Sequence, residues 1–263
     1  MKVTLIQTDI AWNNPIENLQ RAEEALLRHP QTDLFLLPEM FTTGFCTRPS
    51  GVAEVADGAT LHWMKRMSEL TGAGVAGTVA VEEEGRYYNR LYFTTPEGVV
   101  HRYDKRHLFS YGEEHLYYSA GDERVIITHC GTSILLATCY DLRFPVWTRC
   151  RNDYDMIIYL ANWPQTRRAV WDTLLRARAM ENQCYVAGVN RVGEDPVAAY
   201  NGGTMLIDPY GNILTACSDG LPGEVSGEVE VQRVASFRTK FPALDDADNF
   251  TLMEASGQKV KGR

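Results

Sequence analysis

Apolar strand-like runs and amphipathic helical segments alternate along most of the 263 residues. Residues 32–39 (TDLFLLPE) are nearly continuous in apolar character, as in strands buried on both faces. The pattern of residues 166–182 predicts a helix. The apolar positions of that helix are Val170, Leu174, Ala177 and Met180. The other segments predicted as strands are 3–10, 73–82, 87–95, 99–103, 132–139, 155–164, 184–192, 202–214 and 223–231, and those predicted as helices are 14–29, 61–70 and 144–152. This alternation predicts an α/β fold with helices outside and sheets inside.

No segment rich in glycine, serine or proline divides the chain, so a single domain is expected. We assign residues 1–250 to this domain and residues 251–263 to a polar tail that is mobile or lies at a subunit interface. The net charge of −8 argues against nucleic acid or an anionic membrane as partner, because both require basic surface. The N-terminal apolar run is too short and too polar for a signal peptide, which favours a cytoplasmic protein.

The six cysteines contain no C-x-x-C pair, and the histidines show no metal-binding spacing. We therefore expect free thiols in a reducing compartment, with no disulfide framework, no metal and no organic cofactor.

Three chemically useful side chains follow predicted strands directly. Glu39 ends the apolar run LFLLP, Cys139 ends SILLAT, and Lys105 leaves the predicted hairpin. Strand ends in α/β sheets are where sites assemble, because the core holds the backbone while the side chains face a crevice. Taken singly, each residue has an ordinary alternative: a loop carboxylate, a solvated lysine and a buried thiol.

Three motifs in order resemble the carbon–nitrogen hydrolase (nitrilase) superfamily. They are LLPEMFTTGF at 36–45, YDKRHLF at 103–109 and TCYDLRFP at 138–145. Together with NDYDMIIYLANWP and RARAMENQCYVAGVNRVG, they look most like the ω-amidase branch. The resemblance implies a single-domain αββα sandwich that pairs as a homodimer with four layers.

The resemblance also implies roles for the residues that match the motifs. Cys139 would be the nucleophile that forms a thioester, and Glu39 the general base. Lys105 would stabilise the oxyanion together with the backbone N–H of Tyr140. A lysine beside the cysteine is also expected to lower the thiol pKa.

A second glutamate is expected shortly after the lysine motif, where GEEHLYYSAG offers two neighbours. Glu114 matches the family spacing to Gly121 better than Glu113, and would position Lys105 and the substrate amide. A different cysteine hydrolase would need a histidine upstream of Cys139. The candidates for that histidine are His101, His107 and His115.

Aromatic residues near the motifs suggest a narrow pocket for a small linear substrate, although such rings also serve as core. The aromatic candidates are Phe41, Tyr140, Phe144, Trp147 and Trp163. Arg143 is the candidate for binding a substrate carboxylate, unless it pairs with Asp141 or Glu181 instead. Other arginines of the 166–182 helix look like surface ion pairs. They are Arg167, Arg168, Arg176 and Arg178.

The resemblance to the ω-amidase branch implies that the enzyme and water convert 2-oxoglutaramate or 2-oxosuccinamate to the diacid and ammonia, within nitrogen metabolism or methionine salvage. Other branches keep the same Glu–Lys–Cys set, so a nitrilase, an aliphatic amidase and an N-carbamoyl amino acid hydrolase remain alternatives. A ligand-binding scaffold without catalysis is the alternative outside the enzymes.

Overall fold

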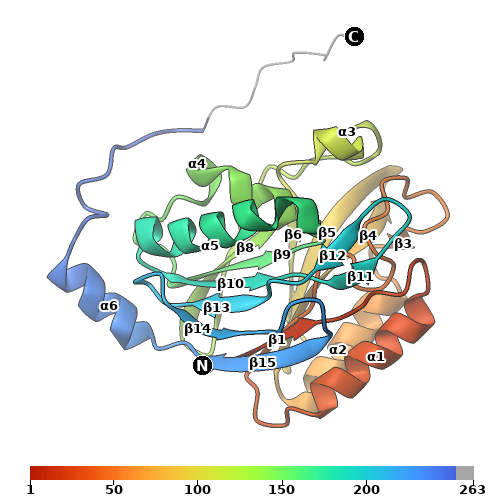
Figure 1. The fold of residues 1–263 in the computed structure, drawn as a ribbon, viewed down its shortest axis with the longest axis horizontal. Coiled ribbons are helices and arrows are strands. Elements are labelled where there is room, and N and C mark those ends of the chain that lie inside the picture. Colours follow the sequence, from red (N-terminus) through yellow and green to blue (C-terminus); the bar gives the residue numbers. More distant parts are fainter. Residues whose placement is uncertain (253–263) are drawn as a thin grey trace.

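Two β-sheets pack face to face, with helices on the outer side of each (Figure 1). The computed structural model describes residues 1–252. The first sheet has the order β15 (Gly223–Glu228), β1 (Lys2–Gln7), β2 (Leu34–Leu36), β4 (Gly74–Glu83), β5 (Arg86–Thr94) and β6 (Val100–Asp104), with β3 (Glu54–Val55) paired to β4. The second has the order β14 (Ile213–Ala216), β13 (Met205–Ile207), β10 (Tyr185–Val189), β9 (Met156–Leu160), β8 (Thr132–Thr138) and β7 (Ile126–His129). A separate hairpin consists of β11 (Val192–Glu194) and β12 (Ala199–Asn201).

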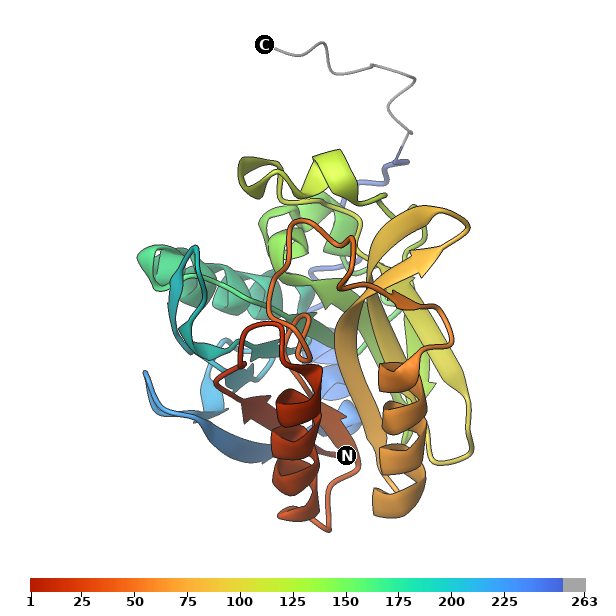
Figure 2. The ribbon, with the colours of Figure 1, turned by 90° about the vertical axis from the view of Figure 1, so that its right-hand side faces the viewer.

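Three of the helices form the outer layers. Helices α1 (Pro15–Leu27) and α2 (Ala59–Thr71) lie side by side on the first sheet (Figure 2), and α5 (Arg168–Asn182) covers the second. The remaining helices are α3 (Glu114–Tyr117), α4 (Pro145–Thr148) and α6 (Val231–Lys240), and 3₁₀ turns span Ser110–Gly112, Cys139–Arg143 and Gln165–Arg167.

Alternation of side chains along the strands divides the core into layers. Leu34 and Leu36 point into the apolar layer between the two sheets, whereas Phe35 packs under α1 and α2. In the second sheet Ile158 joins the central layer and Ile157 packs under α5. Successive residues of a strand point to opposite faces, so a strand with helix on one side and sheet on the other is apolar throughout. The predicted single-domain αββα sandwich is confirmed.

Local signals explain where the first helix begins. The Asn14 side chain accepts a hydrogen bond from the Glu17 amide at 3.3 Å, and Pro15 occupies the first helical position. Both features favour a helix start, since the first turn has amide groups without helical acceptors.

The buried face of α5 differs from the apolar stripe of its sequence. Trp171, Leu175 and Ala179 are buried against the second sheet, while Met180 is 51% exposed. The fully buried stripe therefore lies beside the predicted one, and Val170 and Leu174 pack only partly buried against the same core. Trp171 is fully buried on this face, and its indole Nε1–H donates to the Gly203 carbonyl oxygen at 2.8 Å.

The strand directions bring several carboxyl ends to one edge of the sandwich. In the first sheet β1, β2 and β4 are parallel, and the antiparallel steps from β4 to β5 and from β5 to β6 return β6 to the same direction. In the second sheet β8, β9 and β10 are parallel. The residues that follow β2, β6, β8 and β9 meet at this edge, which positions the site described below.

Within residues 1–252, no helix is long and apolar enough to cross a membrane. Of the predicted tail 251–263, residues 253–263 lie outside the described part of the chain.

Candidate active site

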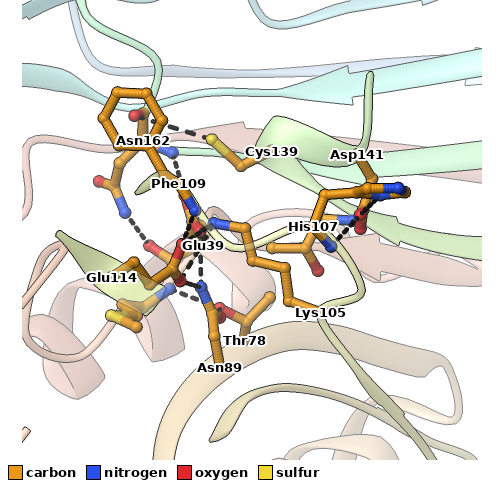
Figure 3. A network of polar contacts seen from close by, with 12 residues as sticks. Glu39, Thr78, Asn89, Lys105, His107, Phe109, Glu114, Cys139, Asp141 and Asn162 are labelled. Atoms are coloured by element: carbon orange, nitrogen blue, oxygen red, sulfur yellow. Dashed lines mark hydrogen bonds and ion pairs between the residues drawn. The ribbon is translucent and has the colours of Figure 1, made fainter. Parts of the chain in front are cut away.

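Side chains from both sheets meet in one buried polar cluster (Figure 3). Glu39 follows β2, Lys105 follows β6, and Glu114 begins α3. Cys139 follows β8 in the second sheet. The sequence-based expectation that Glu39, Lys105 and Cys139 come together agrees with this arrangement, although their chemical roles stay a proposal.

The Lys105 ammonium lies between two carboxylates. Its Nζ donates to Glu39 Oε1 at 2.9 Å and to Glu114 Oε2 and Oε1 at 2.9 and 3.2 Å. Burial by itself would lower the pKa of Lys105, but attraction to Glu114 and Glu39 outweighs it and holds the pKa well above the usual range. Lys105 is therefore a permanent cation at the base of the site.

Two asparagines orient the Glu39 carboxylate. Asn89 on β5 donates its side-chain amide to Oε1 at 2.7 Å, and the backbone N–H of Asn162 donates to Oε2 at 2.8 Å. The Asn162 side chain also donates to the Glu39 carbonyl at 2.5 Å. Because Asn162 follows β9, these bonds connect the two sheets directly at the site.

Glu114, rather than its neighbour, contacts the lysine. Glu114 is fully buried and also accepts hydrogen bonds from the Phe109 amide at 2.6 Å and the Asn89 side chain at 3.1 Å. Burial raises the pKa of Glu114, Lys105 lowers it in part, and Glu39 raises it again. Glu113 has a left-handed backbone with φ of 61° and an exposed side chain, so it turns away from the cluster.

The Cys139 thiol is buried and lies 4.0 Å from the carbonyl oxygen of Asn162. Its backbone is left-handed, with φ of 44°, a conformation that costs about 1–3 kcal/mol for a residue other than glycine. Burial raises the pKa of the thiol well above its usual range, Glu39 raises it further, and Lys105 opposes both. Lys105 therefore lowers the thiol pKa as expected, but burial and Glu39 outweigh its effect.

Asp141 holds the turn that carries the thiol. Its Oδ2 accepts from the Thr138 amide at 2.9 Å and the Tyr103 hydroxyl at 2.7 Å. Its Oδ1 accepts from the His107 amide at 3.0 Å and lies 2.8 Å from His107 Nδ1. The carboxylate is fully buried and joins the Cys139 turn to the loop that follows Lys105.

Substitution of Asp141 by asparagine is expected to loosen this junction. The amide group would present N–H donors where backbone or hydroxyl donors now bind, and each buried group left unsatisfied costs about 1–3 kcal/mol. We expect urea denaturation to show a free energy of unfolding about 2–4 kcal/mol lower, with a reduced kcat. The control is Asp219→Asn, whose carboxylate is 65% exposed. Equal stability of the two variants would contradict this role for Asp141.

A cavity of about 680 Å³ opens above the cluster. Such a volume suits a small molecule rather than a protein segment. Glu39, Lys105 and Cys139 lie on its wall, which also includes the β11–β12 hairpin. The residues that line the cavity are Glu39, Phe45, Thr47, Arg48, Lys105, Phe109, Tyr111, Gly112, Glu113, Cys139, Tyr140, Arg143, Asn162, Trp163, Pro164, Gln165, Thr166, Arg167, Asp195, Val197, Ala198, Ala199 and Tyr200.

Comparison with known proteins identifies the family. The model of the carbon-nitrogen hydrolase family matches residues 2–239. The chain belongs to the carbon-nitrogen hydrolases. It is thus a hydrolase that acts on carbon–nitrogen bonds other than peptide bonds.

Several relatives of this carbon-nitrogen hydrolase match along almost their whole length. "Omega-amidase YafV" of Escherichia coli (strain K12) is 42% identical over 253 residues, covering 96% of this chain and 98% of that protein. "2-oxoglutaramate amidase" of Bacillus subtilis (strain 168) is 35% identical over 250 residues, covering 93% and 96%. The crystal structure of XC1258 from Xanthomonas campestris, a CN-hydrolase superfamily protein with an arsenic adduct in its active site, superposes with a TM-score of 0.94 at 39% identity, covering 96% and 99%.

The structure places some of the predicted substrate contacts of this carbon-nitrogen hydrolase on the cavity wall and others in the core. Tyr140, Arg143 and Trp163 line the cavity. Phe41 does not: it is 1% exposed and packs on Trp63 under α1 and α2, with ring centroids 5.8 Å apart.

Phe144 lies behind the wall as well. Its ring stacks on His107 at 3.8 Å between centroids and packs against the central core, and Trp147 belongs to that core too. The prediction of Phe41 and Phe144 as substrate contacts was therefore wrong, because neither residue lines the cavity.

The histidines considered for a Cys–His mechanism lie elsewhere in the described part of the chain. No histidine is among the cavity-lining residues. His107 binds Asp141, His101 packs edge-on against Phe93, and His115 is exposed. Residues 1–252 also contain no group of three or more His, Cys, Asp or Glu side chains arranged to hold a metal ion.

The arginines expected as surface pairs behave differently from one another. Arg168 pairs with Asp172 and Asp219, and Arg178 is buried and pairs with Glu181. Arg167 instead lines the cavity, where its guanidinium lies over the Phe109 ring, 5.1 Å from the centroid.

Sequence reasoning missed Asn89 and Asn162, which orient Glu39. Asn162 follows an apolar strand in the same way as Glu39 and Cys139, so its position was a usable signal. Asn89 lies inside the β5 run YYNRLYF and carries no local signal beyond being polar in an apolar strand.

Proposed function

We propose that this protein is an ω-amidase. It hydrolyses the terminal amide of a small 2-oxo acid, such as 2-oxoglutaramate or 2-oxosuccinamate, to the dicarboxylate and ammonia. The observation that carries the proposal is the meeting of Cys139, Glu39 and Lys105 at one cavity of small-molecule size, with the buried Glu114 bound to Lys105. The 42% identity to omega-amidase YafV and the 35% identity to 2-oxoglutaramate amidase support the choice of substrate.

In the first half-reaction Cys139 Sγ attacks the amide carbonyl carbon. The S–C bond forms while Glu39 accepts the thiol proton, and the carbonyl oxygen becomes an oxyanion. Glu39 then transfers this proton to the amide nitrogen as the C–N bond breaks, so that ammonia leaves and a thioester remains. In the second half, Glu39 takes a proton from water, whose oxygen attacks the thioester, and the proton returns to the Cys139 sulfur as the acid departs.

The raised pKa of the thiol makes the base necessary. A buried cysteine whose pKa lies well above the usual range is a neutral thiol at physiological pH. The thiolate, rather than the thiol, is the nucleophile, so proton transfer to Glu39 accompanies the attack. Asn89 and Asn162 hold the Glu39 carboxylate in place for this transfer.

Lys105 supplies the positive charge for the oxyanion, together with the backbone N–H of Tyr140. The lysine is already buried and held by Glu114, so little reorganisation is needed when negative charge develops on the substrate. Glu114 acts as a positioning residue for Lys105 and the substrate amide.

Arg143 binds the carboxylate at the far end of the substrate. Its guanidinium lies over the Trp163 ring, 5.2 Å from the centroid, and no ion pair joins it to a carboxylate within residues 1–252. Asp141 and Glu181 were the partners considered from the sequence, but neither forms an ion pair with Arg143. Asp141 binds His107, and Glu181 binds Arg178.

Substitution of Arg143 by methionine is expected to raise the KM for 2-oxoglutaramate roughly 10- to 100-fold, the loss of one charge-assisted contact. Because the guanidinium is remote from the reacting carbonyl, kcat should change little. Steady-state kinetics with 2-oxoglutaramate and with neutral butyramide separate the two effects. An equal loss with both substrates would show that Arg143 supports the wall rather than the carboxylate.

The test of the function is ammonia release from 2-oxoglutaramate, with L-glutamine, a simple nitrile and an N-carbamoyl amino acid alongside. Selective turnover of the oxo amide, lost in Cys139→Ala, is the expected result. Turnover of one of the other compounds in place of 2-oxoglutaramate would assign the protein to a different branch of the superfamily. Absence of Cys139-dependent turnover with all of them would favour the binding scaffold.

The proposal also includes the cellular location, oligomeric state and metabolic role of the enzyme. We place it in the cytoplasm as a homodimer whose catalytic domain is residues 1–250, acting in nitrogen metabolism or methionine salvage without cofactor or metal. The net charge of −8 supports a partner other than nucleic acid or an anionic membrane. Light scattering at low protein concentration tests the dimer.

A further inference from the structure

Arg167 is a cation on the cavity wall that the mechanism above does not use. It ends the 3₁₀ turn Gln165–Arg167, is half-buried, and lies over the Phe109 ring. Within residues 1–252 it forms no ion pair, whereas its neighbour Arg168 pairs with Asp172 at 2.7 Å and Asp219 at 2.9 Å. A guanidinium on a cavity wall without a protein carboxylate is available to an anionic ligand.

Trp163 links Arg167 to Arg143. The indole Nε1–H donates to the Arg167 carbonyl oxygen at 2.9 Å, and the face of the same indole ring supports the Arg143 guanidinium at 5.2 Å from its centroid. Trp163 is 3% exposed, so it is a fixed base for the Arg143 guanidinium and for the backbone of Arg167. Arg143 and Arg167 both line the same cavity, and Trp163, next to the strand end that carries Asn162, contacts both residues.

The carboxylates of the cavity wall are already engaged or peripheral. Glu39 binds Lys105 at 2.9 Å. Asp195 accepts from the amides of Val197 and Ala198, both at 2.8 Å, and from the Tyr200 hydroxyl at 2.6 Å. Glu113 is exposed. Among the described wall residues, no buried free carboxylate is left to receive an ammonium group.

We propose that Arg167 is a second anion-binding residue, which forms with Arg143 a receptor for the 2-oxo-carboxylate end of the substrate and disfavours an α-ammonium group. This inference rests on the proposed function and deepens it. A 2-oxo acid presents three acceptor oxygens, two from the carboxylate and one from the oxo group, which two guanidinium forks can share. An amino acid amide such as L-glutamine places a positive charge where the oxo group stood, beside two cations and no free carboxylate.

The experiment compares Arg167→Gln with the wild type on 2-oxoglutaramate, glutaric acid monoamide, L-glutamine and butyramide. The matched control is Arg176→Gln, an exposed arginine of α5 that does not line the cavity. In Arg167→Gln we expect KM for 2-oxoglutaramate to rise roughly 10- to 100-fold with kcat within about twofold, and butyramide kinetics to stay unchanged. The ratio of kcat/KM for 2-oxoglutaramate to kcat/KM for L-glutamine should fall by a similar factor in Arg167→Gln. In Arg167→Lys this ratio should lie between the values of Arg167→Gln and the wild type.

A double-mutant cycle shows whether the two arginines bind the same group. If they do, the losses in kcat/KM of Arg143→Met and Arg167→Gln will not add in the double variant. A KM for 2-oxoglutaramate within twofold of the wild type in Arg167→Gln would overturn the inference. So would an equal loss with butyramide, which would mean that Arg167 merely supports the wall.

Failure of the proposed function gives a different result from failure of this inference. If the wild type releases no ammonia from 2-oxoglutaramate, the function is wrong. Calorimetric titration of 2-oxoglutarate into Cys139→Ala, with and without Arg167→Gln, then decides the inference separately. If 2-oxoglutarate binds Cys139→Ala but not the variant that also carries Arg167→Gln, the anion receptor is supported. If 2-oxoglutarate binds neither protein, the inference is overturned.

Discussion

Substitution of Cys139 by alanine is expected to lower kcat for 2-oxoglutaramate by at least about 10⁴-fold. The sulfur forms the covalent bond to the acyl group, and no other thiol lies on the cavity wall within the described residues. Removal of one sulfur atom from a site that is 9% exposed should leave the fold intact. Ammonia release measures the activity, and circular dichroism verifies the fold.

One control variant makes this result specific to the nucleophile. Cys150→Ala removes another buried thiol, which packs in the core under α5 and not at the cavity. This variant should retain the kcat of the wild type, with some loss of stability. Similar activity losses in Cys139→Ala and Cys150→Ala would contradict the assignment of the nucleophile.

Substitution of Lys105 by methionine is expected to affect both activity and stability. Loss of the oxyanion-stabilising cation should lower kcat by about 10²- to 10³-fold. The change also leaves Glu39 and Glu114 buried close together without their cation. Breaking a buried ion pair by removing one partner costs about 3–5 kcal/mol in the free energy of unfolding.

The loss in free energy of unfolding caused by Lys105→Met is expected to be larger at neutral pH than at low pH. The pKa of Glu114 is already raised by burial, and loss of Lys105 removes the attraction that opposes this shift. A carboxyl whose folded pKa lies above its unfolded pKa stabilises the fold below the unfolded value, and this contribution is lost as pH rises through the folded pKa. Lys105→Met should therefore lose most stability at neutral pH and approach the wild type as pH falls toward about 4.

Denaturant unfolding at several pH values measures this dependence, with Lys65→Met as the control. Lys65 is a half-buried lysine of α2 whose Nζ lies 3.5 Å from the largely exposed Asp57, so its loss should change stability by less than about 1 kcal/mol. If Lys105→Met keeps wild-type activity and the same pH profile as Lys65→Met, the account of the buried cluster is wrong.

The fold could be predicted because the strands are buried on both faces. Runs such as LFL in β2 are apolar throughout when one face meets a sheet and the other a helix, and the ends of those runs predicted the positions of Glu39, Lys105 and Cys139. The rotation of α5 was not predictable from the apolar stripe, since Trp171 rather than Met180 fills the space against the second sheet.

The sequence did not predict the direction of the Phe41 side chain or the direction of the pKa shift of Cys139. Phe41 lies two residues after Glu39, yet the left-handed backbone of Met40 turns it into the core under α2. Nearness in sequence to a motif therefore does not put a ring on the cavity wall. The pKa of Cys139 depends on burial, Glu39 and Lys105 together, and only the folded geometry shows that the first two outweigh the third.

Capture of the thioester tests the central claim most directly. Wild-type protein mixed with 2-oxoglutaramate, quenched in acid within the first turnover and digested, should give a peptide containing Cys139 whose mass is increased by that of the substrate minus ammonia. The same treatment of Cys139→Ala should give no adduct and no ammonia. Ammonia release from 2-oxoglutaramate by Cys139→Ala at the wild-type rate, without an adduct on the wild type, would contradict the account.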